Sequence, residues 1–223
     1  MLNKIPRKDF LKLSLLAGIG VFGTQRNLFE DDFFYQPATN VVYYKKSDAA
    51  YNVLRKGFNK RIDKYPAVIA LCKNTQGIAE AINYAKQNFL SVTIKSGGHC
   101  MEGFSCNNDG MVINLSLLKS IEWIDANTVK IQPACTLSQL YDELLPKKKM
   151  IPGGSCAGVG IGGLTLGGGY GLMSRRYGLT CDSLTEVTIV DGNGQIRNSA
   201  NDPDLLWACK GGGNGNFGVI SEM

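Results

Sequence analysis

The residues with the clearest chemical potential are Ser96-Gly97-Gly98-His99, which directly follow a stretch ending at Lys95. Glycines just after a strand let consecutive backbone N–H groups point at one anion, so this turn suits a phosphate or pyrophosphate. His99 is the only histidine in the chain, and a neutral imidazole can act as a nucleophile. A lone histidine is more often structural; the position at the mouth of a glycine turn favours a functional role here.

Glycine is over-represented, with 27 of 223 residues, and it is concentrated in two blocks. Eleven glycines lie between Gly153 and Gly178, and five lie between Gly211 and Gly218. Serine and proline do not accompany them, so the blocks are not flexible linkers. The backbone there must adopt unusual dihedral angles or approach something closely.

The first block contains the pattern G-x-G-x-x-G between Gly158 and Gly163. A nicotinamide-binding fold needs a strand before this pattern and a helix after it. Pro152-Gly153-Gly154 precedes it, and we expect no helix over residues 164–169 because three consecutive glycines lie there. A nicotinamide site is therefore disfavoured, and a phosphate loop of ATP or GTP enzymes is absent from the sequence. A glycine-dense extended surface instead suits a large flat ligand.

Several elements are expected to position these segments. The apolar run 66–72 predicts a buried strand, and Ile78, Ala81, Ile82 and Ala85 mark the buried face of a helix with Thr75 as its N-cap. Residues 91–95 predict a second strand, so this β-α-β unit predicts a parallel pair and an α/β layer.

The rest of the chain continues as mixed α and β structure. Thr136 and Gln139 form a T-x-x-Q capping box, which predicts that a helix starts there. Asp191-Gly192-Asn193-Gly194 predicts a tight turn. Leu205, Leu206 and Trp207 indicate a short helix. Further strands are expected at residues 111–115, 128–132 and 184–190 and after the turn.

Composition and charge limit the partners. The chain is 44% hydrophobic and 19% charged, as in ordinary globular proteins. The net charge is +5, and residues 1–26 carry +4 of it, so the rest of the chain lacks the basic face that nucleic-acid binding needs. Seven cysteines occur without a C-x-x-C pair, which predicts no metal site and no disulfide framework but mainly buried thiols.

The N-terminus has the order of an export signal: basic residues 1–12, then the apolar residues 13–22, which are too few to span a bilayer. Arg7-Lys8 resembles a twin-arginine motif with lysine in the second position. The prediction is an exported protein with a leader over 1–26; an uncleaved amphipathic N-terminus is the alternative. Residues 27–60 are expected to form an extension of surface loop and a short helix before a main domain over 61–223.

Three ordered motifs resemble one family. The segment from Ile94 to Ser105 resembles the flavin-attachment loop of FAD-linked oxidases of the berberine bridge enzyme and oligosaccharide oxidase group. The segments Gly154–Asp182 and Asp202–Ile220 resemble the second and third flavin segments of that family. The resemblance implies an α+β fold, the FAD-binding domain of the vanillyl-alcohol oxidase or p-cresol methylhydroxylase (PCMH) type, built of two α/β subdomains. It further implies that the C-terminal substrate domain and its catalytic base are absent from this sequence.

The same resemblance implies the cofactor site. His99 is expected to be joined covalently to the 8-methyl group of FAD, and Cys156 aligns with a cysteine that bicovalent members join to flavin C6; a plain buried thiol is the alternative. Lys95 stands where many members have arginine, and Leu164 stands where some bicovalent members have histidine. The implied cofactor-binding residues are Ser96, Gly97, Gly98, His99, Cys100, Gly103, Gly154, Ser155, Cys156, Val159, Gly160, Gly163, Val219 and Ile220.

The function implied by the resemblance is oxidation of an alcohol, sugar or similar small molecule by hydride transfer to covalent FAD. A non-catalytic flavin-binding remnant is the alternative. No residue of this sequence is assigned as catalytic, and no metal is expected.

Overall fold

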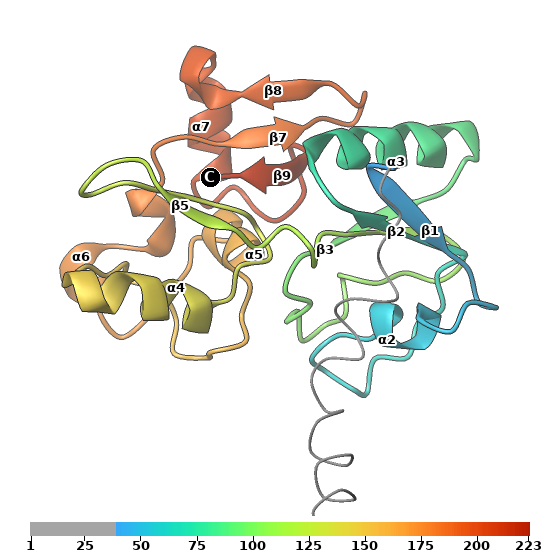
Figure 1. Cartoon of the computed structure of the whole chain (residues 1–223), viewed down its shortest axis with the longest axis horizontal. Coiled ribbons are helices and arrows are strands. Elements are labelled where there is room, and N and C mark those ends of the chain that lie inside the picture. The colour runs from blue at the N-terminus through green and yellow to red at the C-terminus, as the bar shows by residue number, and fades with distance from the viewer. Residues whose placement is uncertain (1–38) are drawn as a thin grey trace, which may run out of the picture. The chain divides into compact units, whose positions relative to one another are not determined.

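The computed structural model describes residues 39–223, which form two α/β lobes (Figure 1). The N-terminal lobe (residues 39–118) contains one four-stranded sheet, and the C-terminal lobe (residues 119–223) contains two smaller sheets. This arrangement confirms the predicted α+β class with two subdomains. The leader predicted over residues 1–26 lies outside the described residues. Within residues 39–223 no helix has both the length and the apolar character needed to cross a membrane.

The sheet of the N-terminal lobe has the order β1-β2-β4-β3, with β2 (Val68–Cys72) and β3 (Val92–Lys95) each parallel to β4 (Met111–Asn114). The sequence predicted a parallel β2 and β3 as neighbours. Their direction is as predicted, but β4 lies between them. All four residues of β4 are buried, whereas β3 begins with an exposed Val92, so the more apolar strand takes the centre.

Strand β1 (Val41–Tyr44) pairs antiparallel with β2, and helix α2 (Tyr51–Arg55) follows. The expectation of only loop and a short helix over residues 27–60 therefore missed a strand of the main sheet. The run Val41-Val42-Tyr43-Tyr44 has strong strand propensity but is too short for a periodic signal. The boundary expected at residue 61 does not coincide with a break in the structure, since residues 39–223 form one compact unit.

Helix α3 (Thr75–Gln87) buries the predicted face of Ile78, Ala81, Ile82 and Ala85. Its N-cap is Asn74 and not Thr75. The Asn74 side chain accepts a hydrogen bond from the backbone N–H of Gly77 at 2.9 Å, while Thr75 is already helical. The helix packs with the sheet in a core that also includes Val190 and Val219 of the other lobe, so the lobes share hydrophobic contact.

The C-terminal lobe begins with an antiparallel pair, β5 (Ile121–Trp123) and β6 (Val129–Ile131). Helix α4 (Leu137–Leu144) starts at the predicted capping box of Thr136 and Gln139, which is present in the structure. The remaining helices are α5 (Ile161–Leu166), α6 (Ser174–Tyr177) and α7 (Pro203–Cys209), and the short 3-10 helices are Leu145–Lys147, Thr180–Ser183 and Ser199–Asn201.

The last sheet has the order β8-β7-β9, formed by β7 (Thr188–Val190), β8 (Ile196–Asn198) and β9 (Val219–Glu222). The predicted turn between β7 and β8 is present: the Asp191 carboxylate accepts from the N–H groups of Asn193 and Gln195, and Gly194 has φ +77°. Strand β7 is shorter than the predicted 184–190. Strand β9, which directly follows the C-terminal glycine block, pairs antiparallel with β7 (Figure 1).

Candidate FAD site

Lys95, the last residue of β3, anchors the turn that carries His99. Its ammonium group donates hydrogen bonds to the carbonyl oxygens of Leu54 at 2.7 Å and Lys56 at 2.6 Å. The side chain is buried, and this burial lowers the pKa of Lys95 to about 8. Lys95 therefore ties the start of the turn to helix α2 and to the residue that follows it.

The turn itself presents free backbone donors. Within residues 39–223 the N–H groups of residues 97–100 form no hydrogen bond with the protein. Gly98 has φ +65°, a conformation that glycine adopts without strain. A row of unpaired N–H groups in such a turn is suited to an anion. The Ser96 hydroxyl, in contrast, is used internally, since it donates to the carbonyl oxygen of Pro133.

The first glycine block meets this turn backbone to backbone at Gly97 and Gly160. A Cβ atom added to Gly97 would lie 2.4 Å from the Gly160 nitrogen, and one added to Gly160 would lie 2.6 Å from the Gly97 nitrogen. No side chain fits between the two segments. The absence of a side chain at Gly97 and at Gly160 thus allows these two segments, which are far apart in sequence, to lie against each other.

His99 lies between a residue of each lobe. Its imidazole stacks on the ring of Phe58, with the ring centroids 3.9 Å apart and the planes 16° apart. Its Cδ2–Nε2 edge faces Gly158, where an added Cβ atom would lie 4.0 Å from Nε2. The imidazole thus lies where the turn after β3 and the first glycine block meet.

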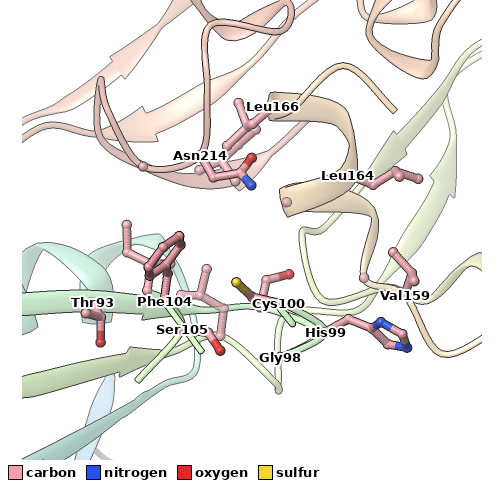
Figure 2. Close-up of a pocket in the computed structure, with 18 of the residues that line it drawn as sticks. Thr93, Gly98, His99, Cys100, Phe104, Ser105, Val159, Leu164, Leu166 and Asn214 are labelled. Carbon is pink, nitrogen blue, oxygen red and sulfur yellow. The ribbon is translucent and has the colours of Figure 1, made fainter. Parts of the chain in front are cut away.

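These segments enclose a cavity of about 570 Å³ between β3, helix α5 and the C-terminal glycine block (Figure 2). Nine of the fourteen predicted cofactor residues line it. They are Ser96, Gly97, Gly98, His99, Cys100, Val159, Gly160, Gly163 and Ile220.

The other five predicted residues do not line the cavity. Val219 is buried in the core beside Ile220. Gly103, in the segment after His99, has φ +74°, and the Gly154 carbonyl oxygen accepts a hydrogen bond from the Tyr141 hydroxyl at 2.8 Å. Ser155 and Cys156 are exposed.

Cys156 begins a short turn that passes close to the His99 imidazole. Its carbonyl oxygen accepts a hydrogen bond from the N–H of Val159, and the turn so closed contains Gly158, the neighbour of the imidazole. Its exposure excludes the alternative that Cys156 is a buried core thiol. Five other cysteines do behave as buried thiols, as predicted.

Sequence reasoning missed a part of the cavity wall. Helix α5 was not expected, because the glycines after Gly160 argued against a helix; it forms because its Ile161 and Leu166 are buried in the core clusters. Asn214 belongs to a glycine turn that the sequence did single out, and its side chain points into the cavity (Figure 2). The missed lining residues are Val92, Thr93, Ile94, Glu102, Phe104, Ser105, Leu115, Leu164, Leu166, Asn214, Gly215 and Gly218.

Two further observations fit a dinucleotide such as FAD. The Thr93 hydroxyl oxygen is buried at the cavity and has no hydrogen-bond partner in the described part of the chain, so it is available to a polar ligand atom. A Cβ atom added to Gly163 would meet nothing within 4 Å, so the backbone of α5 is open to the cavity. The cavity volume is within the usual range for bound cofactors.

Comparison with known proteins agrees with this site. Residues 66–200 match the family described as the FAD binding domain. An uncharacterized FAD-linked oxidoreductase of Bacillus subtilis is 39% identical over 185 residues, which are 80% of this chain and 41% of that protein. The aclacinomycin-N/aclacinomycin-A oxidase of Streptomyces galilaeus is 35% identical and covers 82% of this chain and 36% of its own length.

Solved structures have the same fold. The 6-hydroxy-D-nicotine oxidase of Arthrobacter nicotinovorans superposes with a TM-score of 0.78 at 28% identity, covering 86% of this chain and 43% of that one. The glucooligosaccharide oxidase of Acremonium strictum superposes with a TM-score of 0.76 at 30% identity, covering 82% of this chain and 39% of that one. The latter is described with a 6-S-cysteinyl, 8α-N1-histidyl FAD.

The chain spans about two fifths of the length of the curated relatives it matches. The matched region includes the turn with His99, the first glycine block and most of the cavity wall. This chain therefore belongs to the FAD-binding domain family of FAD-linked oxidoreductases, with berberine bridge enzyme-like proteins and oligosaccharide oxidases among its relatives.

Proposed function

We propose that the chain binds FAD in the cavity between its lobes and acts as the FAD-binding part of a flavin-dependent oxidoreductase. The observation that carries this proposal is the contact of Gly97 with Gly160 at the wall of the cavity, beside a turn with unpaired N–H groups. The N–H groups of residues 97–100 would hold the pyrophosphate, and Gly160, Gly163 and Ile220 would contact the rest of the cofactor. When bound, FAD supplies two-electron redox chemistry that protein side chains lack.

We further propose that His99 holds the cofactor covalently. The imidazole nitrogen forms a bond to the carbon of the flavin 8-methyl group, and that methyl group and the imidazole N–H each lose one hydrogen. The two electrons released in this step pass to dioxygen, which becomes hydrogen peroxide. Cys156 is proposed as a second attachment point, through a bond from its sulfur to flavin C6 with the same balance of electrons; a thiolate is the nucleophile.

The test is the flavin content of the unfolded protein. The chain is produced with FAD, denatured in acid and separated by electrophoresis, and fluorescence and mass report the covalently bound flavin. With two links, His99→Ala and Cys156→Ser each retain flavin and only the double variant loses it. With the histidine link alone, His99→Ala loses all of it.

A control separates attachment from adsorption: chain that is denatured before FAD is added should carry no flavin. A wild-type chain that stays colourless after expression with excess FAD would contradict the FAD site altogether. Flavin that is bound but lost entirely on denaturation would contradict the covalent links only.

The proposed reaction is oxidation of an alcohol, sugar or similar small molecule by hydride transfer to the bound flavin. The relatives named above include an oligosaccharide oxidase and an aclacinomycin oxidase, and the chain spans about two fifths of their lengths. The second candidate is therefore a flavin-binding module without turnover. Anaerobic bleaching of the flavin absorbance by a panel of sugars and alcohols distinguishes the two candidates, because substrate reduces the bound flavin only in an oxidoreductase.

The proposed location is outside the cytoplasm. It depends on the basic and apolar order of residues 1–26 and on Arg7-Lys8. Fusion of residues 1–26 to a reporter that is active only after export tests it, with Arg7 and Lys8 both replaced by glutamine as the variant. A wild-type fusion without reporter activity would contradict export, and equal activity in the wild type and the variant would contradict a role of Arg7 and Lys8.

A further inference from the structure

The ring of Phe58 lies face to face with the imidazole of His99 at a centroid distance of 3.9 Å. Phe58 lies outside the region that matches the family and outside the predicted site. A ring stacked on one face of an imidazole restricts rotation of the histidine side chain, while both ring nitrogens remain free at the edge. The contact therefore limits the directions in which His99 can present a nitrogen.

The backbone around Phe58 is bonded to the same turn on both sides of His99. The Phe58 N–H donates to the carbonyl oxygen of Gly98 at 2.9 Å, and the Asn59 side-chain amide donates to the carbonyl oxygen of Met101 at 2.8 Å. Gly57 permits this approach, because a Cβ atom there would lie 2.7 Å from the Gly98 oxygen. The two hydrogen bonds and the close approach at Gly57 thus fix the position of Phe58 relative to the His99 turn.

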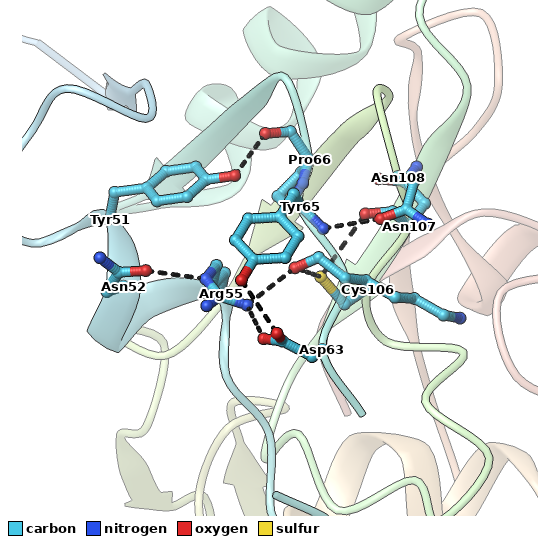
Figure 3. Close-up of polar contacts among 10 residues, drawn as sticks. Tyr51, Asn52, Arg55, Asp63, Tyr65, Pro66, Cys106, Asn107 and Asn108 are labelled. Atoms are coloured by element: carbon cyan, nitrogen blue, oxygen red, sulfur yellow. Dashed lines mark hydrogen bonds and ion pairs between the residues drawn. The ribbon is translucent and has the colours of Figure 1, made fainter. Parts of the chain in front are cut away.

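The loop that carries Phe58 is itself closed at its base. Arg55 forms an ion pair with Asp63 at 2.6 Å, and its guanidinium lies 4.0 Å from the centre of the Tyr65 ring (Figure 3). The Arg55 side chain is 5% exposed. Lys95 adds a second connection between this loop and the His99 turn, because its ammonium group donates hydrogen bonds to the carbonyl oxygens of Leu54 and Lys56. Phe58 therefore projects from a fixed loop and not from a free segment.

Burial accounts for only part of the position of Phe58. The residue is 56% exposed, so more than half of its surface remains in water. The contact with His99 adds the favourable interaction of stacked rings on an anchored loop.

We infer that Phe58 is a positioning residue for covalent flavin attachment, which fixes the plane of the His99 imidazole before the bond to the 8-methyl carbon forms. This inference rests on the proposed function, in which His99 carries the FAD. It predicts that Phe58 affects the rate of attachment more than the affinity for FAD.

The first test compares the rate of covalent attachment after FAD is added to apoprotein from riboflavin-starved cells. Phe58→Leu should slow attachment about tenfold, which corresponds to about 1.4 kcal/mol in the barrier, with an unchanged noncovalent dissociation constant, because loss of the stack removes the orientation of the imidazole. Phe58→Tyr keeps the ring and should attach flavin within about twofold of the wild-type rate. Phe89→Leu, the same substitution at a side chain that is 96% exposed, is the matched control.

The second test needs no flavin. Because His99 is the only histidine in the chain, the apoprotein has one set of imidazole C–H signals in proton NMR. The stacked Phe58 ring should shift these signals upfield, and Phe58→Leu should return them toward the values of a free histidine, while Phe89→Leu leaves them unchanged.

The outcomes distinguish the positioning role of Phe58 from the covalent link through His99. Equal attachment rates in wild type and Phe58→Leu overturn the positioning role alone. Imidazole signals that do not move in Phe58→Leu would show that the Phe58 ring does not stack on His99, and the positioning role depends on that stack. A wild-type chain that binds FAD without any covalent bond overturns the His99 link of the proposed function, and the positioning role with it.

Discussion

At the scale of single residues, the site depends on common side chains whose burial and hydrogen-bond partners give them a particular role. Lys95 is the clearest example. Its buried ammonium group donates to two backbone carbonyl oxygens, and no carboxylate within residues 39–223 accepts a hydrogen bond from it. A lysine in such surroundings is easier to deprotonate than an arginine. The anchor of the His99 turn is therefore titratable.

This predicts a pH dependence of stability. Burial lowers the pKa of Lys95 from 10.5 to about 8, so between these values the unfolded chain holds a proton that the folded chain has released. Stability contributed by this group therefore rises as pH increases from 8 to 10.5. Relative to Lys95→Met, the free energy of unfolding of the wild type should rise over that window by as much as about 3 kcal/mol.

Urea unfolding at intervals between pH 7 and pH 10.5 measures this difference. Lys86→Met, which removes an exposed lysine from helix α3, is the control for loss of a positive charge. A difference between wild type and Lys95→Met that does not change with pH would show that Lys95 titrates normally in the folded chain.

At the scale of elements, the site is made by segments that meet through glycine. The turn after β3 and the strand-like entry to α5 touch at Gly97 and Gly160, and helix α5 then presents the bare backbone of Gly163 to the cavity. These two kinds of glycine have different roles. Gly97 permits contact between segments of the protein, whereas Gly163 leaves room for a ligand.

Alanine substitution distinguishes the two roles. Gly97→Ala places a methyl group 2.4 Å from a backbone nitrogen, and we expect a loss of about 2 kcal/mol or more of stability together with loss of FAD binding. Gly163→Ala meets no atom within 4 Å and lies in a helix, so without FAD it should stabilise the chain by about 0.5–1 kcal/mol. The same variant should bind FAD more weakly.

Urea unfolding without FAD and titration with FAD, each on both variants, provide the two readouts. Undiminished FAD affinity in Gly163→Ala would mean that the cofactor does not lie against α5. A stable Gly97→Ala would mean that the two segments can separate without cost.

At the scale of the whole molecule, residues 39–223 form one compact unit with a cavity lined by both lobes. The lobes share part of one core through Val190 and Val219, and their backbones meet at Gly97 and Gly160 in the cavity wall. A ligand that binds both walls is bound only by the folded arrangement. It must therefore stabilise that arrangement by an amount that grows with the logarithm of its concentration above the dissociation constant.

FAD at one hundred times its dissociation constant should raise the free energy of unfolding by about 2.7 kcal/mol, or the midpoint of thermal unfolding by roughly 5–10 °C. Circular dichroism at increasing FAD concentrations measures the midpoint. NAD at the same concentration is the control, and it should produce no shift because the glycine pattern lacks the preceding strand of a nicotinamide site. Equal shifts with both dinucleotides would contradict a flavin-specific cavity.

The sequence alone determined the local features that depend on near neighbours in the chain. The capping box of Thr136, the apolar face of α3 and the turn at Asp191 are encoded within a few residues, and each formed as expected. The ordered glycine motifs identified the family for the same reason, since each motif is a short local pattern.

Tertiary structure decided what depends on distant neighbours. The place of β4 between β2 and β3, and the helix α5 inside a glycine block, follow from burial that no local pattern shows. The stack of Phe58 on His99 joins residues 41 positions apart through a loop closed by an ion pair. Local propensity cannot encode such contacts, because they are stabilised only when the whole core brings both partners together.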